Sequence, residues 1–195
     1  MSRPKEYIRE KVLDDATRVF WQKGYSSSSL SELVAKTGLN KHSLYKEFGS
    51  KAGLFDECLE NYTRKFMQEL LKILQKRPLG LANIRAFFEN RIDHICSKDF
   101  KCCLMVKSTV EKELIEKSAL DRVRHQGQKF GKAIMDCIEA AVRSGELPRS
   151  TDPALLTSYL IHFLSGMMVV GKPEKGKEDA KKLLDLVMTA ISTGS

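Results

Sequence analysis

The stretch Ser29–Phe48 reads SLSELVAKTGLNKHSLYKEF and predicts two short helices joined by a tight turn. Ser29 is a good N-cap residue, and Glu32 three positions later completes a capping box. Gly38 suits the left-handed backbone in which helices commonly end, and Asn40 is a good N-cap for the second helix. Two helices around a Gly-containing turn form the helix-turn-helix plan, whose second helix enters the major groove of DNA.

The second helix is expected to face the core on one side and DNA on the other. Leu44 and Phe48 lie four residues apart and share the inward face. The residues expected to hold phosphates are Ser28, Ser29, Lys41, Lys46 and Lys51. Those expected to meet base edges or the sugar-phosphate wall are His42, Ser43 and Tyr45. The alternative interpretation is an ordinary helical hairpin within an all-helical core.

Residues 7–66 resemble the DNA-binding domain of TetR-family transcriptional regulators. The most specific part of the resemblance is the run Ser43-Leu44-Tyr45-x-x-Phe48-x-Ser50-Lys51. This chain departs from the family where Ser28 and Ser29 replace the usual Thr, and where His42 replaces a frequent Gly. The resemblance implies a sequence-specific DNA-binding regulator that is a homodimer. It further implies a repressor that a small-molecule effector releases from a palindromic operator.

The charge of the chain agrees with a polyanionic partner. The 195 residues carry a formal net charge of +8, and the isoelectric point is about 9.2. Half of this net charge lies in residues 1–51, which hold ten Lys or Arg and six Asp or Glu. The first residues show no secretory signal, and the five cysteines have no regular spacing. We therefore expect a reduced, cytoplasmic protein.

Periodic apolar positions predict an all-α protein of about nine helices. A helix over about residues 4–23 and the helix-turn-helix pair form a three-helix DNA-binding domain, residues 1–50. A long helix over about 51–75 joins it to an effector-binding and dimerisation domain, residues 51–195. Further helices are expected over 81–96, from about 102, and over 119–144, 153–170 and 177–193.

The helix expected over 153–170 is apolar on nearly every side. It is too short and too often interrupted by polar residues to make a good membrane span, so we expect no membrane partner. A helix that is apolar all round must be buried all round, which predicts a core on one face and a second subunit on the other. By resemblance, this helix and the last one form half of a four-helix dimer interface.

The resemblance also implies an effector pocket among the fourth to eighth helices. The candidate lining residues are large apolar side chains: Phe66, Phe87, Phe88, Met105, Phe130, Met135 and Phe163. Taken singly, each of these side chains is better explained as part of an ordinary helical core, because Phe at helical spacing is typical of cores. No cofactor is expected, and the scattered histidines with no Cys-x-x-Cys spacing argue against a metal site.

The adjacent pair Cys102-Cys103 offers an alternative means of regulation. Lys101 and Lys107 flank the pair, which lies near an expected helix start, and both features lower the pKa of a thiol. In a subset of TetR-family regulators the sixth helix starts with Gly-Cys-Leu, and here Cys102 stands in place of the Gly. The pair is therefore either a switch sensitive to oxidation or electrophiles, or two small buried side chains.

An enzyme is the remaining class to consider. A hydrolase would need a pair such as Cys103 with His94 or His125. The sequence contains no nucleophile elbow, no Gly-rich phosphate loop and no metal-ligand spacing. We therefore expect that the protein is not an enzyme.

Overall fold

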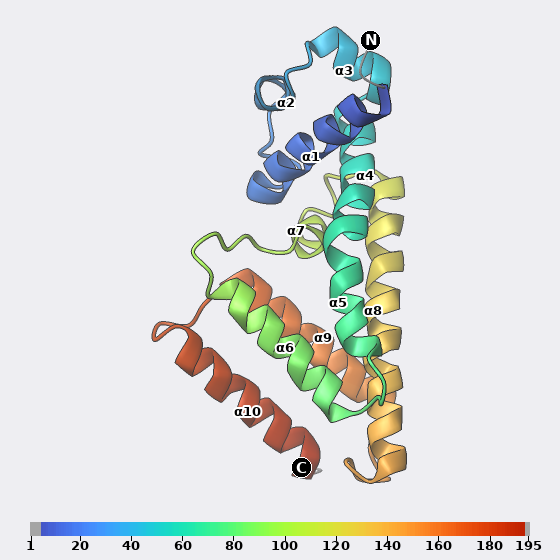
Figure 1. Cartoon of the computed structure of the whole chain (residues 1–195), viewed down its shortest axis with the longest axis vertical. Helices are drawn as coiled ribbons and strands as arrows, with labels where there is room; N and C mark the ends of the chain where they lie inside the picture. Colours follow the sequence, from blue (N-terminus) through green and yellow to red (C-terminus); the bar gives the residue numbers. More distant parts are fainter. Residues whose placement is uncertain (1–4, 194–195) are drawn as a thin grey trace. The chain divides into compact units, whose positions relative to one another are not determined.

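The computed structural model describes the backbone of residues 5–193 and the side chains of residues 9–192. Pro4, the expected first residue of the first helix, lies outside this range. Over the described range the chain consists of helices and connecting turns, with no strand, which confirms the predicted all-α class (Figure 1).

The first three helices are α1 (Lys5–Lys23), α2 (Leu30–Thr37) and α3 (Lys41–Phe48). The long helix expected over residues 51–75 is also present. It comprises α4 (Lys51–Tyr62), a π-helical segment η1 (Thr63–Met67) and α5 (Gln68–Gln75). Such π-helical turns inside α-helices occur frequently at functional sites.

Five helices follow in the order expected from the sequence. They are α6 (Leu81–Ile95), α7 (Leu104–Val110), α8 (Lys117–Ser144), α9 (Pro153–Val170) and α10 (Lys177–Thr193). With α4, η1 and α5 taken as one continuous helix, the described part of the chain has the nine helices that were predicted.

The chain divides into two compact units whose boundaries differ from the expected break after residue 50. The first unit is the chain up to Met67 together with Lys101–Gln126, and the second is Gln68–Phe100 together with the chain from Gly127. The first unit is larger than three helices because α4 packs against α1 and α3, and α7 packs against α4. On the long helix the boundary falls where η1 ends.

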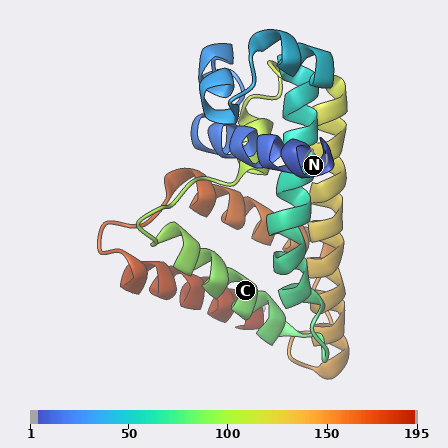
Figure 2. The same ribbon diagram turned by 45° about the horizontal axis from the view of Figure 1, so that its top comes forward.

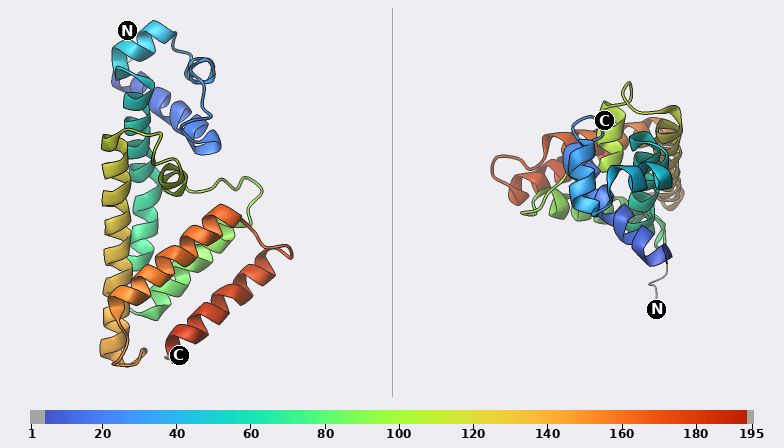
Figure 3. Two further views of the ribbon diagram at one scale, coloured as in Figure 1. Left: turned by 180° about the vertical axis from the view of Figure 1, so that it is seen from behind. Right: turned by 90° about the horizontal axis from the view of Figure 1, so that it is seen from above.

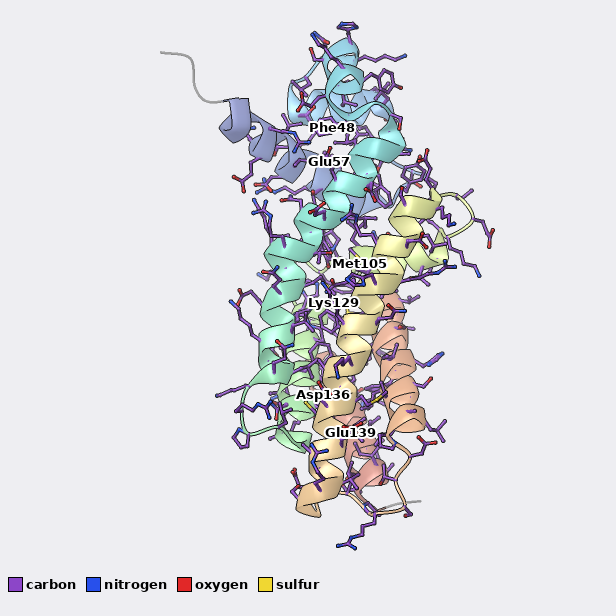
Figure 4. The ribbon with its side chains drawn as sticks, turned by 90° about the vertical axis from the view of Figure 1, so that its right-hand side faces the viewer. Phe48, Glu57, Met105, Lys129, Asp136 and Glu139 are labelled. Atoms are coloured by element: carbon purple, nitrogen blue, oxygen red, sulfur yellow. The ribbon has the colours of Figure 1, made fainter. Side chains whose placement is uncertain are left out.

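The core of the first unit forms where α1 packs against α2 and α4. Phe20, Leu33 and Leu44 are completely buried there, and the Phe20 and Phe55 rings meet edge to face at 4.9 Å. Arg9 on α1 pairs with Glu47 on α3, at 2.9 Å, and with Glu57 on α4. The labelled Phe48 and Glu57 side chains show where α3 ends and α4 runs (Figure 4).

The second unit is organised around α6, which packs against α5, α9 and α10 (Figures 2 and 3). Phe87 and Phe88 on α6 are buried. The ring centre of Phe87 lies 5.9 Å from that of Phe130, and the ring centre of Phe88 lies 5.5 Å from that of Phe163. Contrary to the expectation that it is too short, α9 is, by length and composition only, the one described helix long and apolar enough to cross a membrane, and 17% of it is buried.

Candidate nucleic-acid interface

The local signals in Ser29–Phe48 act as the sequence predicts. The Ser29 hydroxyl accepts a hydrogen bond from the Glu32 N–H at 3.2 Å, and the Glu32 carboxylate accepts one from the Ser29 N–H at 3.0 Å. Gly38 has a φ of 71°, the left-handed conformation that ends α2. The Asn40 side chain accepts from the Ser43 N–H at 2.8 Å and caps α3. The predicted helix-turn-helix is therefore confirmed.

The orientation of α3 separates its core residues from its polar ones. Leu44 is completely buried and Phe48 is 7% exposed. Lys41, His42, Tyr45 and Lys46 are exposed, and Ser43 is half-buried. This face offers two ammonium groups, an imidazole, a hydroxyl and a phenol, which are the donors and acceptors that read DNA.

Two of the expected phosphate contacts are serines at the start of α2, and they differ in exposure. Ser29 is exposed, although its hydroxyl also serves the helix cap. Ser28 is completely buried, and its hydroxyl donates to the Gly24 carbonyl at 2.6 Å. The expected contact of the Ser28 hydroxyl with a phosphate is therefore corrected, because this hydroxyl faces the protein interior.

Lys51 opens α4 directly after its N-cap, Ser50, whose hydroxyl accepts from the Gly53 N–H at 3.0 Å. Its ammonium lies 4.4 Å from the centre of the Tyr25 ring. Burial lowers the pKa of Lys51, and the nearby Glu111 carboxylate opposes this shift. The ammonium is thus held in one place at the N-terminus of a helix, where the helix dipole also favours an anion.

The turn between α1 and α2 has partners that sequence reasoning missed. Lys107, on α7, donates to two carbonyls at the end of α1, and Glu111, just after α7, accepts from two N–H groups of the turn. The Trp21 indole N–H donates to the Cys102 carbonyl at 2.9 Å. The sequence holds a signal for Lys107 and Glu111, because they lie four residues apart and so share one face of a helix. It holds no signal for their partners about 85 positions away.

The cysteine pair differs from the expectation. Cys102 is half-buried, and burial together with the neighbouring Cys103 raises its pKa to about 11, although Lys107 opposes the shift. The expectation of a lowered pKa is therefore wrong for Cys102. The Cys103 sulfur accepts a hydrogen bond from the Tyr62 hydroxyl at 3.6 Å.

The seven candidate pocket residues are divided between the two units. Phe66 and Met105 belong to the first unit, and the others belong to the second. In the second unit Phe87, Phe88 and Phe130 are buried in the core, while Phe163 lines an apolar cavity of about 310 Å³. The remaining residue, Met135, is half-buried on α8.

Two further polar groups stand out, and sequence reasoning missed both. The Thr63 hydroxyl, in η1, and the Gln126 side-chain nitrogen, on α8, are buried without a hydrogen-bond partner among the described residues. A buried donor without an acceptor costs roughly 1–3 kcal/mol. Among the residues that the structure describes, no group of three His, Cys, Asp or Glu side chains is arranged to hold a metal ion.

Comparisons with known proteins agree with this geometry. Residues 12–58 match the family described as "Bacterial regulatory proteins, tetR family", and residues 80–185 match "Tetracyclin repressor-like, C-terminal domain". The chain is 28% identical over 194 residues to the HTH-type transcriptional repressor ComR of Escherichia coli K12, covering 97% of this chain and 90% of ComR.

Two solved structures share the fold. One is a cysteine mutant of the TetR family transcriptional regulator CifR in complex with 26 bp double-strand operator DNA, with a TM-score of 0.82 and 24% identity. It covers 97% of this chain and 100% of that one. The other is the reduced form of Escherichia coli NemR, with a TM-score of 0.78, 21% identity and coverage of 93% and 95%. The chain belongs to the TetR family of bacterial transcriptional regulators, which act by binding DNA.

Proposed function

We propose that the protein is a repressor that binds a palindromic operator as a homodimer and leaves it when an effector binds. The observation that carries the proposal is the exposed polar face of α3, with its ends set by the Asn40 cap and the Gly49 exit. The relative ComR is itself called a repressor. We further propose that the protein has no enzymatic activity and acts in the cytoplasm, where its operator lies.

Each proposed DNA contact has a definite task. The phosphate contacts are Ser29, Lys41, Lys46 and Lys51, and they fix the position of the protein on DNA without regard to sequence. The contacts to base edges or the sugar-phosphate wall are His42, Ser43 and Tyr45. Among these, His42 presents an imidazole whose nitrogens donate or accept, so it is suited to discriminate between bases.

The homodimer is proposed to form through α9 and α10. Large apolar side chains remain exposed on both helices: Leu155, Tyr159, Val169, Val170, Leu183 and Leu186, which are 45–81% exposed. Many large exposed apolar side chains on two helices favour a protein–protein interface, and a second copy of the chain offers the matching surface. A two-fold dimer presents two α3 helices, and half-sites about 34–36 Å apart then follow from one turn of DNA.

Release is proposed to occur through a small-molecule effector. The buried, unpartnered Gln126 nitrogen and Thr63 hydroxyl support an effector that carries a hydrogen-bond acceptor. In the second unit, the half-buried apolar residues Met135 and Phe163 remain candidates for the lining of a separate effector site. An effector that binds one arrangement of the helices more tightly than the other shifts the population away from the DNA-binding form.

A thiol switch is the second candidate for release, and Cys103 is the residue that supports it. Cys103 is half-buried at the N-cap position of α7, where its side chain makes no capping hydrogen bond, and its neighbour Cys102 has a raised pKa. The solved relatives point the same way, since one is a cysteine mutant and another is called a reduced form. In this version the Cys103 sulfur adds to the activated carbon–carbon double bond of an electrophile such as a maleimide. The S–H bond and the C=C π bond break, an S–C bond forms, the thiol proton passes to water, and water returns a proton to the neighbouring carbon.

The test is selection of DNA by the purified protein from a library of random-sequence duplexes, followed by fluorescence anisotropy with the enriched duplex. The proposal expects a palindromic motif whose binding survives an excess of unrelated DNA. Enrichment of no motif would contradict operator binding. A Cys103→Ser variant that is still released by a small thiol-reactive maleimide would remove the thiol switch and leave the small-molecule effector.

A further inference from the structure

The turn between α1 and α2 is held by a segment more than 80 residues away in sequence. The Lys107 ammonium, on α7, donates to the carbonyls of Trp21 at 2.9 Å and Gln22 at 2.8 Å. These are among the last carbonyls of α1, which ends at Lys23, and carbonyls at a helix end commonly bind groups outside the helix. A cation is favourable there because the C-terminal end of a helix carries partial negative charge.

The Glu111 carboxylate binds the next part of the same turn. It accepts from the Tyr25 N–H at 2.7 Å, from the Ser26 N–H at 3.0 Å and from the Ser26 hydroxyl. The fit is close: a Cβ at Gly24, where φ is +85°, would lie 2.8 Å from a carboxylate oxygen of Glu111. The carboxylate therefore packs against Gly24 and is bound by two backbone N–H groups of the turn.

Lys107 and Glu111 are matched to the turn in charge and in spacing. They lie four residues apart, so they share one face at the end of α7. The cation meets carbonyl oxygens, and the anion meets N–H groups. Hydrogen bonds that involve a charged group are about twice as strong as neutral ones. The Lys107–Glu111 pair therefore fixes where α1 ends and where the chain turns toward α2.

The position of this turn bears directly on the proposed DNA contacts. Glu111 binds the N–H of Tyr25. The ring of the same tyrosine makes a cation–π contact with the Lys51 ammonium, which lies 4.4 Å from the ring centre. The same turn leads into Ser29, the exposed N-cap of α2, and α2 packs against both α1 and α3. A shift of the turn must therefore displace both a phosphate contact and the helix that supports the recognition helix.

The chain connectivity gives this arrangement a regulatory meaning. The chain passes from the second unit into the first between Phe100 and Lys101, forms α7, and returns to the second unit after Gln126, within α8. Both ends of the segment that carries the Lys107–Glu111 pair are thus covalently joined to the second unit. A rearrangement of those connections has a direct route to the turn through α7.

We propose that Lys107 and Glu111 are positioning residues for operator binding, and that displacement of α7 lowers operator affinity by withdrawing them from the α1–α2 turn. This inference rests on the operator binding proposed above. It adds a regulatory contact that does not depend on whether the primary signal is a small molecule or a thiol modification.

The experiment uses the full-length protein and the duplex enriched by the wild type. The variants are Glu111→Ala, Lys107→Met and the double substitution, with Glu113→Ala as the control, because Glu113 is 86% exposed and pairs only loosely with Lys112 at 3.9 Å. All are compared at a temperature where circular dichroism shows them folded. Each single variant is expected to bind the enriched duplex about tenfold more weakly, the effect of one lost charged hydrogen-bonding group. Glu113→Ala is expected to bind like the wild type.

Three readouts separate positioning from a general loss of stability. The double variant should bind more tightly than independent effects would predict, because both residues act on one turn. The dependence of affinity on salt should stay unchanged, because the phosphate contacts remain. In the DNA-free protein, the amides of Tyr25 and Ser26 should exchange with deuterium about tenfold faster in Glu111→Ala.

Two outcomes would overturn the inference. One is a lowered melting temperature with unchanged affinity of the folded variants, which would make the pair purely structural. The other is unchanged amide exchange at Tyr25 and Ser26. A wild type that enriches no motif contradicts operator binding itself, so failure of the proposed function is recognised before any variant is compared.

Discussion

Gly53, in the first turn of α4, lies so close to Phe48, the last residue of α3, that a Cβ at Gly53 would be 2.2 Å from the Phe48 carbonyl oxygen. The obstructing atom belongs to the backbone, so it cannot move aside as a flexible side chain would. The junction between the recognition helix and α4 therefore depends on the absence of a side chain at this position.

Gly53→Ala is expected to destabilise the protein by about 1–3 kcal/mol, the usual effect of inserting a methyl group where there is no space. Urea unfolding followed by circular dichroism measures this change. Gly127→Ala is the control, because a Cβ at Gly127 would meet nothing within 4 Å in the interior of α8. It should stabilise the protein by up to ~1 kcal/mol. Equal stability of the two variants would show that α3 and α4 meet differently.

Lys46→Ala and Lys51→Ala are each expected to weaken binding to every DNA sequence. Loss of one phosphate contact should reduce the slope of log affinity against log salt by about 0.9. Anisotropy titrations at several salt concentrations measure the slope. Lys132→Ala is the control, since Lys132 is 78% exposed on α8 and pairs with Asp136. A variant that keeps the wild-type slope has not lost a phosphate contact.

Leu186→Arg is expected to convert the proposed dimer into monomers. Leu186 is 67% exposed on α10, so the substitution leaves the core intact but places a charge within the proposed interface. Sedimentation velocity measures the oligomeric state. Val110→Arg provides a matched control, because Val110 is 73% exposed at the end of α7, outside both interface helices. A Leu186→Arg variant that sediments as a dimer would place the interface elsewhere.

Glu32 is expected to make stability depend on pH in acid. The hydrogen bond from Lys23, together with those from the Ser29 N–H and hydroxyl, lowers the pKa of Glu32 from 4.5 to about 2. A carboxyl whose pKa is lower in the folded state stabilises that state above its unfolded pKa. This contribution is lost as the pH falls from 4.5 toward 2.

Unfolding by urea at several pH values, for the wild type and Glu32→Gln, tests this prediction. The difference between the two midpoints should be largest at neutral pH and should shrink as the pH approaches 2. A difference that stays constant with pH would mean that the carboxylate charge contributes nothing to the capping box.

Native alkylation should distinguish the cysteines. Burial raises the pKa of Cys58 to about 12 and that of Cys137 to about 11, and burial with the neighbouring Cys103 raises that of Cys102 to about 11. The thiolate is the reactive form, so iodoacetamide at pH 7.5 should label these three last. Mass spectrometry of peptides after timed quenching gives the order. Early labelling of Cys102 would contradict its burial.

The sequence by itself determined the features that depend on neighbouring residues. The Ser29 and Asn40 caps, the left-handed Gly38 and the apolar periodicities appear in the structure where they were predicted. Helix ends are local events, because a capping side chain reaches only two or three residues along the chain. Helix positions and the helix-turn-helix could therefore be predicted from one sequence.

Only the tertiary structure decided which distant groups meet. The Ser28 hydroxyl faces the interior rather than DNA, burial raises the Cys102 pKa in spite of Lys107, and α7 belongs with the DNA-binding helices. The Glu111 carboxylate meets the Tyr25 N–H across 86 positions of sequence. Such contacts depend on how helices pack, and packing is the sum of many weak apolar contacts that no local pattern encodes.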